Sequence, residues 1–294
     1  MSASLANRLL QRLRPYLPAP LRPPEIPVVP VVRLTGVIGF STPLSPGITM
    51  VGVARMLERA FDVADAKAVA IVINSPGGSA VQSHLIHRRI RMLAEDADLP
   101  VLVFVEDVAA SGGYMIACAG DEIFADPSSI VGSIGVIGAT FGFDRLMDKI
   151  GVERRVYTAG ERKSMLDPFR PEDPDDVERL KTIQRAIHAK FIALVKERRG
   201  ERLKEPDGSL FTGEYWEAER AEAFGLIDGF GDARSVLRGR FGDEVATPLI
   251  TAERTLFGRR LPGFSAAPAA PGAGLAADLV SAIEARALWS RYGL

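Results

Sequence analysis

The sequence predicts an α/β fold built around a parallel sheet. Short runs of β-branched and apolar residues, at 68–73 and 101–105, alternate with longer segments of helical periodicity, at 49–64 and 80–95. Such alternation is typical of βαβ units, in which a helix connects two parallel strands. The chain has 294 residues, of which 47% are hydrophobic and 25% charged, so it can bury a substantial core.

The remaining elements are predicted in chain order around these four. A first strand is expected at 31–40, and further strands are expected at 122–125, 134–138 and 154–157, while the segment at 226–229 helps to complete the core. A long charged and amphipathic helix covers 172–199, opened by Pro171 and ended near Gly200, and a last core helix covers 232–240. A helix as long as 172–199, standing off a compact body, is commonly an interaction element.

Both ends of the chain differ in composition from its centre. Residues 1–24 carry leucines at helical spacing beside arginines, which indicates a basic amphipathic helix that lies on an anionic membrane surface or docks on a protein. A proline-rich spacer follows at 15–30, and an Ala, Pro and Gly rich linker at 265–274 precedes a helical tail at 275–292. The predicted domains are residues 1–30, 31–245 and 246–294, of which the central one is the main folded body.

The composition argues against several classes of function. The 36 basic and 37 acidic residues leave a net charge of −1, which gives no field to attract nucleic acid. Cys118 is the only cysteine and is expected to be a buried small hydrophobe, while His84 and His87 share a helical face expected to be solvated, so no metal site is predicted.

No run of 18 apolar residues encodes a transmembrane helix, and arginines interrupt the apolar core that a cleavable signal peptide needs. The glycine-rich phosphate-binding loop is absent as well, and no cofactor is expected.

The stretch at 101–120 combines a strand, a sharp turn and a helical segment. The apolar run ends at Glu106 and Asp107, and the small residues at 109–113 then form a corner with Ser111 at the turn. At the start of a helix a serine side chain lies beside unpaired backbone N–H groups, and the glycines after it allow close approach of a substrate. This environment favours negative charge, and an ordinary helix N-cap is the alternative that the stretch leaves open.

Three other loops follow predicted strands and carry unusual residues. Residues 74–79 read Asn-Ser-Pro-Gly-Gly-Ser, where the paired glycines expose N–H groups suited to an oxyanion hole. Residues 126–138 place Ser133 between glycines, and Lys163 lies in the loop at 158–165. Ligands bind at the carboxyl ends of parallel strands, where such loops gather. Taken singly, each loop fits an ordinary tight turn, and Lys163 fits an ordinary surface lysine.

Together the four segments resemble the signal peptide peptidase A family of serine proteases, in its short, single-copy bacterial form. The matching motifs are NSPGG at 74–78, ASGGY at 110–114, GSIGVIG at 132–138 and GERKSM at 160–165, in the family's order. The resemblance runs from about residue 31 to 240 and implies a Clp/crotonase-like α/β fold of repeated β-β-α units with a parallel sheet.

The resemblance also implies a role for each candidate site residue. Ser111 matches the nucleophile and Lys163 the general base of a serine–lysine dyad. Ser133 matches a serine that holds the lysine in place, and Gly78 and Gly112 match the donors of the oxyanion hole. The pairing makes chemical sense, because a serine hydroxyl needs a base to take its proton and a lysine can be that base when burial lowers its pKa.

The resemblance further implies an assembly, because in the short form the serine and the lysine come from neighbouring subunits of a ring. This single-copy chain is therefore expected to act as a homo-oligomer, with the helix at 172–199 as a candidate contact surface. The expected function is a serine endopeptidase that hydrolyses signal peptide remnants or other small apolar peptides near the membrane. Attachment through residues 1–22 to the cytoplasmic face of a bacterial membrane is expected in place of the family's frequent transmembrane anchor.

Two other functions remain open from the sequence. A catalytically inactive, membrane-associated scaffold could have the same fold. A crotonase-like acyl-CoA enzyme would use the same oxyanion geometry to stabilise an enolate, but it would not require both Ser111 and Lys163.

Overall fold

The computed structural model describes residues 26–39, 47–160, 162–204, 208–251, 255–256, 259–260 and 286–293. Its helices are α2 (Met50–Phe61), α3 (Ala80–Ala97), α4 (Gly112–Ala117), α5 (Asp144–Ile150), α6 (Pro174–Arg199), α7 (Ala218–Ala223) and α8 (Ala233–Phe241), with 3-10 turns η3 (Gly200–Arg202) and η4 (Ser209–Phe211). Its strands are β1 (Val31–Thr35), β2 (Val69–Ser75), β3 (Val101–Ala110), β4 (Glu122–Ala125), β5 (Ile130–Gly132), β6 (Tyr215–Glu217), β7 (Gly229–Phe230), β8 (Leu249–Ile250), β9 (Thr255–Leu256) and β10 (Arg259–Arg260). A further short helix covers 286–290.

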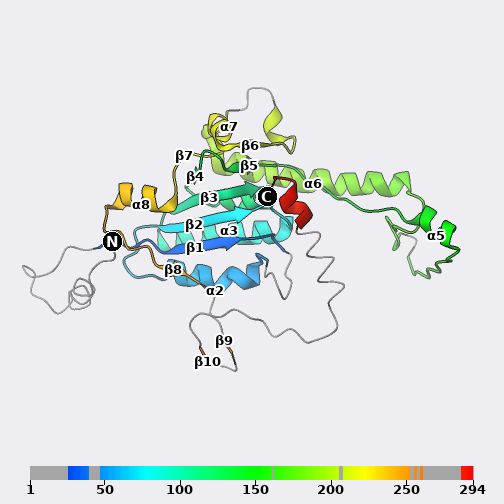
Figure 1. Ribbon diagram of the computed structural model, residues 1–294, viewed down its shortest axis with the longest axis horizontal. Helices are drawn as coiled ribbons and strands as arrows, with labels where there is room; N and C mark the ends of the chain where they lie inside the picture. The colour runs from blue at the N-terminus through cyan, green and yellow to red at the C-terminus, as the bar shows by residue number, and fades with distance from the viewer. Residues whose placement is uncertain are drawn as a thin grey trace, which may run out of the picture.

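A mostly parallel sheet forms the centre of the molecule (Figure 1). Strands β1, β2 and β3 lie side by side in parallel, and β8 pairs with the free edge of β1. Strand β3 is long enough to pair with two strands in succession: its first half pairs with β4 and its second half with β5. The carboxyl ends of the central strands therefore meet at one edge, where the predicted site loops begin.

Each unit of the sheet consists of a strand, a shorter second strand and a helix. After β1, Ile38 forms parallel bridges to Ile48 and Gly78 before the chain enters α2. After β2, Gly78 makes its bridge just before α3, and the second half of β3 pairs with β5 before α4. The predicted α/β class with a parallel sheet and its repeated β-β-α units are confirmed.

Alternating side chains of the strands bury two different faces. One face packs on α2, α3, α4 and the end of α6 in a large cluster that includes Leu57, Ile90 and Phe191. The other face packs on α8 through a smaller cluster centred on Leu237, Leu102 and Phe104. Helix α8 covers only the amino-terminal part of this second face (Figure 1). Farther along the strands Arg33 and Asp107 are exposed and Glu106 is half-buried.

The long helix α6 leaves the body of the molecule. Its N-cap is Asp173, whose side chain accepts a hydrogen bond from the N–H of Asp175, so the helix begins at Pro174 and not next to Pro171. Its buried residues lie in the carboxyl-terminal part, and Figure 1 shows its amino-terminal part extending to an arm that carries α5. The predicted helix is confirmed, and it joins the arm to the body.

Two predicted strands are wrong. The strand expected at 134–138 is β5, at Ile130–Gly132, and the segment expected at 154–157 has no strand structure. Residues 152–158 are exposed and have no ladder partner among the described residues, and a β-branched sequence becomes a strand only when a neighbour accepts its hydrogen bonds. The arm contains α5 instead, which the sequence pattern did not reveal.

The predicted amino-terminal amphipathic helix and the linker at 265–274 lie outside the described residues. Among the helices that the structure does describe, none has both the length and the apolar character required to span a membrane.

Candidate active site

Ser111 occupies a sharp corner between β3 and α4. Its φ of +51° and ψ of −120° lie in a region that residues with side chains rarely adopt. The corner is held by a 2.8 Å hydrogen bond from the N–H of Ser111 to the carbonyl oxygen of Gly132. Although Ser111 is at the N-cap position, its side chain makes no capping hydrogen bond with the described part of α4. The hydroxyl of Ser111 is therefore not used as a helix cap.

Glycines allow the loop after β2 to touch this corner. A Cβ atom on Gly77 would lie 2.8 Å from Cβ of Ser111, and one on Gly78 would lie 2.1 Å from the carbonyl oxygen of Ile38. Both glycines also have positive φ, at +101° and +140°. Gly112, at the first position of α4, would carry a Cβ 2.3 Å from Oγ of Ser83. The two predicted oxyanion donors, Gly78 and Gly112, thus lie on the two loops that meet at Ser111.

Ser133 lies in the third loop, directly after the residue that binds the backbone of Ser111. It is buried and has a positive φ of +54°, and its N–H donates to the carbonyl oxygen of Glu214. Its Oγ accepts a 3.3 Å hydrogen bond from the hydroxyl of Tyr292, near the carboxyl terminus. In this single chain a tyrosine thus occupies the contact that the family resemblance assigns to the lysine.

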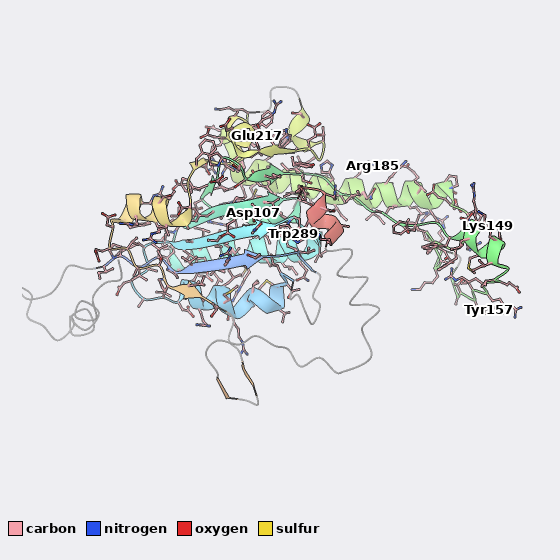
Figure 2. All side chains as sticks on the ribbon, viewed as in Figure 1. Asp107, Lys149, Tyr157, Arg185, Glu217 and Trp289 are labelled. Atoms are coloured by element: carbon pink, nitrogen blue, oxygen red, sulfur yellow. The ribbon has the colours of Figure 1, made fainter. Side chains whose placement is uncertain are left out.

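The carboxyl-terminal segment covers an apolar face beside the site. Tyr292 and Trp289 pack against Val108, Ala110 and Ile130, which lie on the paired ends of β3 and β5. Figure 2 shows Trp289 on the short terminal helix at this end of the sheet. The ring of Tyr292 also meets that of Tyr215 edge to face at 4.9 Å.

Lys163 is not part of this group in the single chain. It is exposed, and its N–H bonds to the carbonyl oxygen of Gly160 in its own loop. The loop is tied to the start of α6, because the N–H of Leu166 donates to the carboxylate of Asp176. The third site loop instead meets α6 at His188, whose Nε2 lies 2.9 Å from the carbonyl oxygen of Ile134. These two contacts are three helical turns apart, on the order of 18 Å along the helix.

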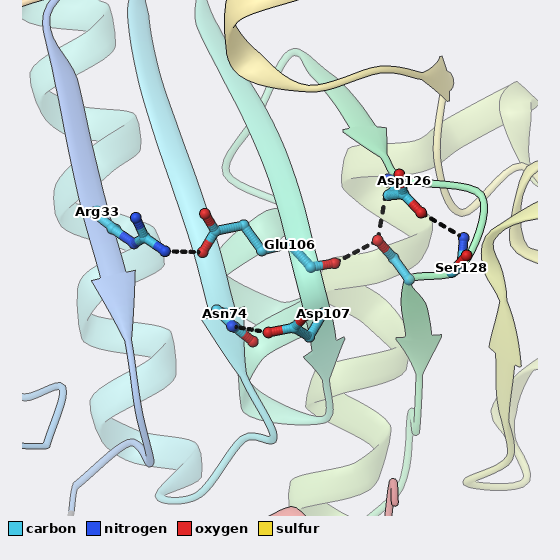
Figure 3. A pocket seen from close by; sticks show the side chains of 7 residues that line it. Arg33, Asn74, Glu106, Asp107, Asp126 and Ser128 are labelled. Carbon is cyan, nitrogen blue, oxygen red and sulfur yellow. Dashed lines mark hydrogen bonds and ion pairs between the residues drawn. The ribbon is translucent and has the colours of Figure 1, made fainter. Parts of the chain in front are cut away.

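The polar floor below the loops was not predicted from the sequence. A cavity of about 350 Å³ opens on the face of the sheet beyond α8, and Figure 3 shows its polar lining: Arg33, Asn74, Glu106, Asp107, Asp126, Ser128 and Ser129. Asn74 donates a 2.5 Å hydrogen bond to the carboxylate of Asp107, and Arg33 forms a 2.7 Å ion pair with Glu106. The sequence does contain a signal for this cavity, because polar residues interrupt the apolar runs of β2 and β3 just before the motifs that carry Gly78 and Ser111.

Other nucleophiles and metal sites receive no support. Burial raises the pKa of the Cys118 thiol to about 12, so this predicted buried cysteine is neutral and unreactive at neutral pH. Within the described parts of the chain, no group of three or more His, Cys, Asp or Glu side chains could hold a metal ion. Among the described residues, Ser111 is the side chain that combines a strained corner, partial exposure and flanking glycines.

A family profile and several known proteins that match this chain are named as peptidases or proteases. The sequence profile described as peptidase family S49 matches residues 94–239. A Synechocystis protein named as a candidate protease is 33% identical over 206 residues, covering 67% of this chain and 72% of that protein. The chloroplastic serine protease SPPA of Arabidopsis thaliana is 32% identical over 69% of this chain and 30% of its own length.

A more similar relative has a different name. A Brucella abortus protein named Na(+)/H(+) antiporter NhaA is 55% identical over 99% of this chain, but the match covers 40% of that protein. The chain thus spans less than half the length of the Brucella and Arabidopsis relatives. Among solved structures, a mutant of the membrane-bound stomatin-specific protease 1510-N matches with a TM-score of 0.44 at 18% identity, covering 78% of this chain and 94% of that one.

Proposed function

The chain belongs to peptidase family S49, of the signal peptide peptidase A type, and from that premise we propose that it is a serine endopeptidase with a serine–lysine dyad. Ser111 is the proposed nucleophile and Lys163 the proposed general base. Ser133 is proposed to orient the lysine, and the N–H groups of Gly78 and Gly112 to bind the oxyanion. The observation that carries the proposal is the corner at Ser111, where a strained backbone presents an uncapped hydroxyl between two glycine loops.

The proposed chemistry follows the usual two steps of acyl transfer. Oγ of Ser111 attacks the scissile carbonyl carbon while its proton passes to Nζ of the lysine, and two backbone N–H groups stabilise the negative oxygen. The lysine then returns the proton to the leaving amine, which leaves an acyl-serine. Water, deprotonated by the same lysine, hydrolyses this ester and restores the serine.

A second copy of the chain is proposed to supply the lysine. Lys163 and Ser111 are separated within one chain, and the arm that carries Lys163 exposes apolar side chains, among them Phe141 at 78% and Tyr157 at 90%. Figure 2 shows Lys149 and Tyr157 at the far end of this arm. Exposed apolar groups of this extent mark an interaction surface. Docking on a neighbour would cover them and would also bury the lysine, which is the condition for a lysine to act as a base.

The proposed substrates are signal peptide remnants or other small apolar peptides. Support comes from the face of Val108, Ala110 and Ile130, which is apolar, adjoins Ser111 and accepts the aromatic side chains of the chain's own tail. An apolar peptide segment would bury itself there in the same way.

We further propose that the protein works at the membrane. The basic segment at 1–22 has the pattern of an interfacial helix, and the Brucella relatives are named as antiporters, an activity of membranes. Flotation with anionic vesicles is expected for the full chain and not for a chain that starts at Glu25. Equal flotation of both chains would remove residues 1–22 as the attachment and, with them, the reason to place the enzyme on the cytoplasmic face.

A fluorophosphonate probe tests the proposed activity directly. We expect the intact oligomer to be labelled at Ser111, with the adduct located by mass spectrometry. Labelling should vanish in Ser111→Ala and fall at least about 10²-fold in Lys163→Ala, since a positioned general base contributes that much or more.

The matched control is His188→Gln, because His188 hydrogen-bonds to the third loop but has no contact with Ser111 among the described residues. Labelling should survive this change. Loss of labelling in His188→Gln but not in Lys163→Ala would overturn the dyad. No labelling of a folded, oligomeric wild type would favour the inactive scaffold or the acyl-CoA enzyme.

A further inference from the structure

Strand β3 carries an irregularity directly below the active-site loops. Ile73 pairs with Val105 and Ser75 pairs with Ala109, so the single residue Asn74 lies opposite three residues of β3, at 106–108. An insertion of this kind bends a strand and re-aims its side chains, and such bulges are frequent next to active sites. Here it turns the carboxylate of Asp107 toward the amide of Asn74 on the neighbouring strand (Figure 3).

The bond between these two side chains is short and charge-assisted. Nδ2 of Asn74 donates to Oδ2 of Asp107 at 2.5 Å, shorter than most neutral hydrogen bonds. Asn74 is 8% exposed, and its other polar atom, Oδ1, is buried without a hydrogen-bond partner among the described residues. A buried acceptor without a partner opposes folding, so stability does not explain an asparagine at this position.

The rest of the bulge is tied to the neighbouring elements. Glu106 forms an ion pair with Arg33 of β1, and its carbonyl oxygen accepts a hydrogen bond from the hydroxyl of Ser129. Ser129 directly precedes β5, and Ser133 directly follows that strand. All three site loops are thus connected at the level of the bulge.

The position of the bond along the two strands connects it to the chemistry. Asn74 precedes Gly78 by four residues, and Asp107 precedes Ser111 by four residues. The bond therefore joins the two strands four residues before the proposed oxyanion donor on one strand and four residues before the proposed nucleophile on the other. Above it, Gly77 packs against Ser111 so closely that no Cβ would fit.

We propose that Asn74 and Asp107 are positioning residues that fix the oxyanion loop against the nucleophile loop. The proposal rests on the proposed peptidase function and adds a pair of residues that contact neither substrate nor the reacting atoms. Removing the bond lets the two loops shift relative to each other, and a displacement near 1 Å at a reacting centre costs about 10²-fold in rate.

The test measures the rate of Ser111 labelling by the fluorophosphonate in the full-length oligomer, beside the melting temperature. Asn74→Leu keeps the side-chain shape and removes Oδ1, the buried acceptor that has no hydrogen-bond partner among the described residues. The carboxylate of Asp107, which is exposed, stays hydrated in this variant. We expect a loss of about 10- to 100-fold in labelling rate with an unchanged or raised melting temperature. A role confined to stability predicts a lowered melting temperature and unchanged labelling.

Exchanging the asparagine and the aspartate between positions 74 and 107 should restore the labelling rate. A purely structural role would not predict this rescue. Asn74→Asp sets two carboxylates against each other and Asp107→Asn removes the charge, so each single variant should label slowly. The double variant re-forms an amide–carboxylate bond in the reverse direction and should recover to within about threefold of wild type. Asp126→Asn is the matched control, because it removes a charge from the same cavity but Asp126 bonds within its own loop.

The outcomes separate the two proposals. An unlabelled wild type overturns the peptidase and this inference with it. A labelled wild type whose rate is indifferent to Asn74→Leu, or a double variant as slow as the singles, overturns the positioning role alone. A change confined to the KM of peptides that carry a basic residue would also overturn it, because the cavity would then be a binding site for cations.

Discussion

Ser111 shows at the scale of single residues how the chain holds an unfavourable conformation in place. Its positive φ is an arrangement that typically costs about 1–3 kcal/mol. The backbone hydrogen bond to Gly132 and the contact with Gly77 hold it from two sides. We expect Gly77→Ala to disturb this corner even though Gly77 has no side chain to lose.

His87 provides a prediction about pH and stability. Burial, followed by the nearby guanidinium of Arg198, lowers the pKa of His87 to about 4. The unfolded chain, with a histidine pKa near 6.5, therefore binds more protons between these two values. The contribution of His87 to the free energy of unfolding is fully present above about pH 6.5 and is lost as the pH drops toward 4. From pH 7 to pH 5 the free energy of unfolding should decrease by about 2 kcal/mol through this group.

Denaturant unfolding of His87→Gln at the two pH values checks this. The variant should lose about 2 kcal/mol of the pH dependence, whereas His84→Gln, which alters an exposed histidine three residues earlier on the same helix, should not. An unchanged pH dependence in His87→Gln would show that the imidazole is not buried in the neutral form.

The sequence predicted some of these residues and not others for a physical reason. Ser111, Gly78 and Ser133 stand in local motifs whose glycines and turns are visible in the chain itself. The burial of His87, expected to be solvated, depends on α3 packing against the segment after α4, which no local pattern encodes. The bond between Asn74 and Asp107 likewise depends on a register shift between two strands.

At the scale of elements, helix α6 is fixed at its carboxyl-terminal end. Arg199 is 1% exposed and makes two hydrogen bonds of 2.8 and 2.9 Å to the carboxylate of Asp228, next to β7. Burial is the largest single influence and would raise the pKa of Asp228, but the hydrogen bonds and charge of Arg199, the N–H of Ile123 and the charge of Arg202 together keep this pKa below its ordinary value. The arm at the other end of α6 is thus carried by a firmly attached helix.

Breaking this ion pair should destabilise the protein strongly. Asp228→Asn leaves the guanidinium of Arg199 buried without its counter-charge, and we expect a loss of about 3–5 kcal/mol in the free energy of unfolding. Glu122→Gln is the control, because Glu122 forms a similar two-pronged pair with Arg240 that is exposed to solvent, and it should cost less than about 1 kcal/mol. Equal losses in both variants would contradict the structural role of the buried pair.

The terminal helix at 286–290 should restrict access to the site. Deleting 286–294 uncovers the face of Val108 and Ala110 and frees the hydroxyl of Ser133. Burying one aromatic side chain contributes about 1.5–3 kcal/mol, so Ser111 should label at least about tenfold faster in the truncated chain. Tyr292→Phe, which removes only the hydrogen bond, should have a smaller effect. A labelling rate indifferent to the deletion would mean that the segment leaves the site in the oligomer.

The elements that could be predicted from sequence are those with a strong local period. Strand β4 and helices α3 and α8 agree closely with their predicted ranges, because their apolar residues recur at the spacing of a buried face. The arm lacks such a face within the chain, and there a β-branched run was mistaken for a strand. The fold of the described residues leaves its apolar side chains exposed, and the proposed neighbouring subunit would cover them.

At the scale of the whole molecule, one copy does not bring the two residues of the proposed dyad together. The body holds Ser111, Gly78, Gly112 and Ser133 together. The loop of Lys163 is instead tied to the start of α6, the helix whose amino-terminal part extends to the arm (Figure 1). A head-to-tail contact between copies would place each arm on the next body, and such contacts close into rings. Every site of the proposed enzyme would then contain residues of two subunits.

Mixing two inactive variants tests this central claim most directly. Ser111→Ala and Lys163→Ala would be unfolded, refolded together in equal amounts and assayed by probe labelling and peptide hydrolysis. Random assembly joins an intact serine to an intact lysine at one interface in four, so we predict about a quarter of wild-type activity, and at most about 1% in either variant alone. If the mixed oligomer stays inactive while its size matches the wild type, the dyad is not shared between subunits.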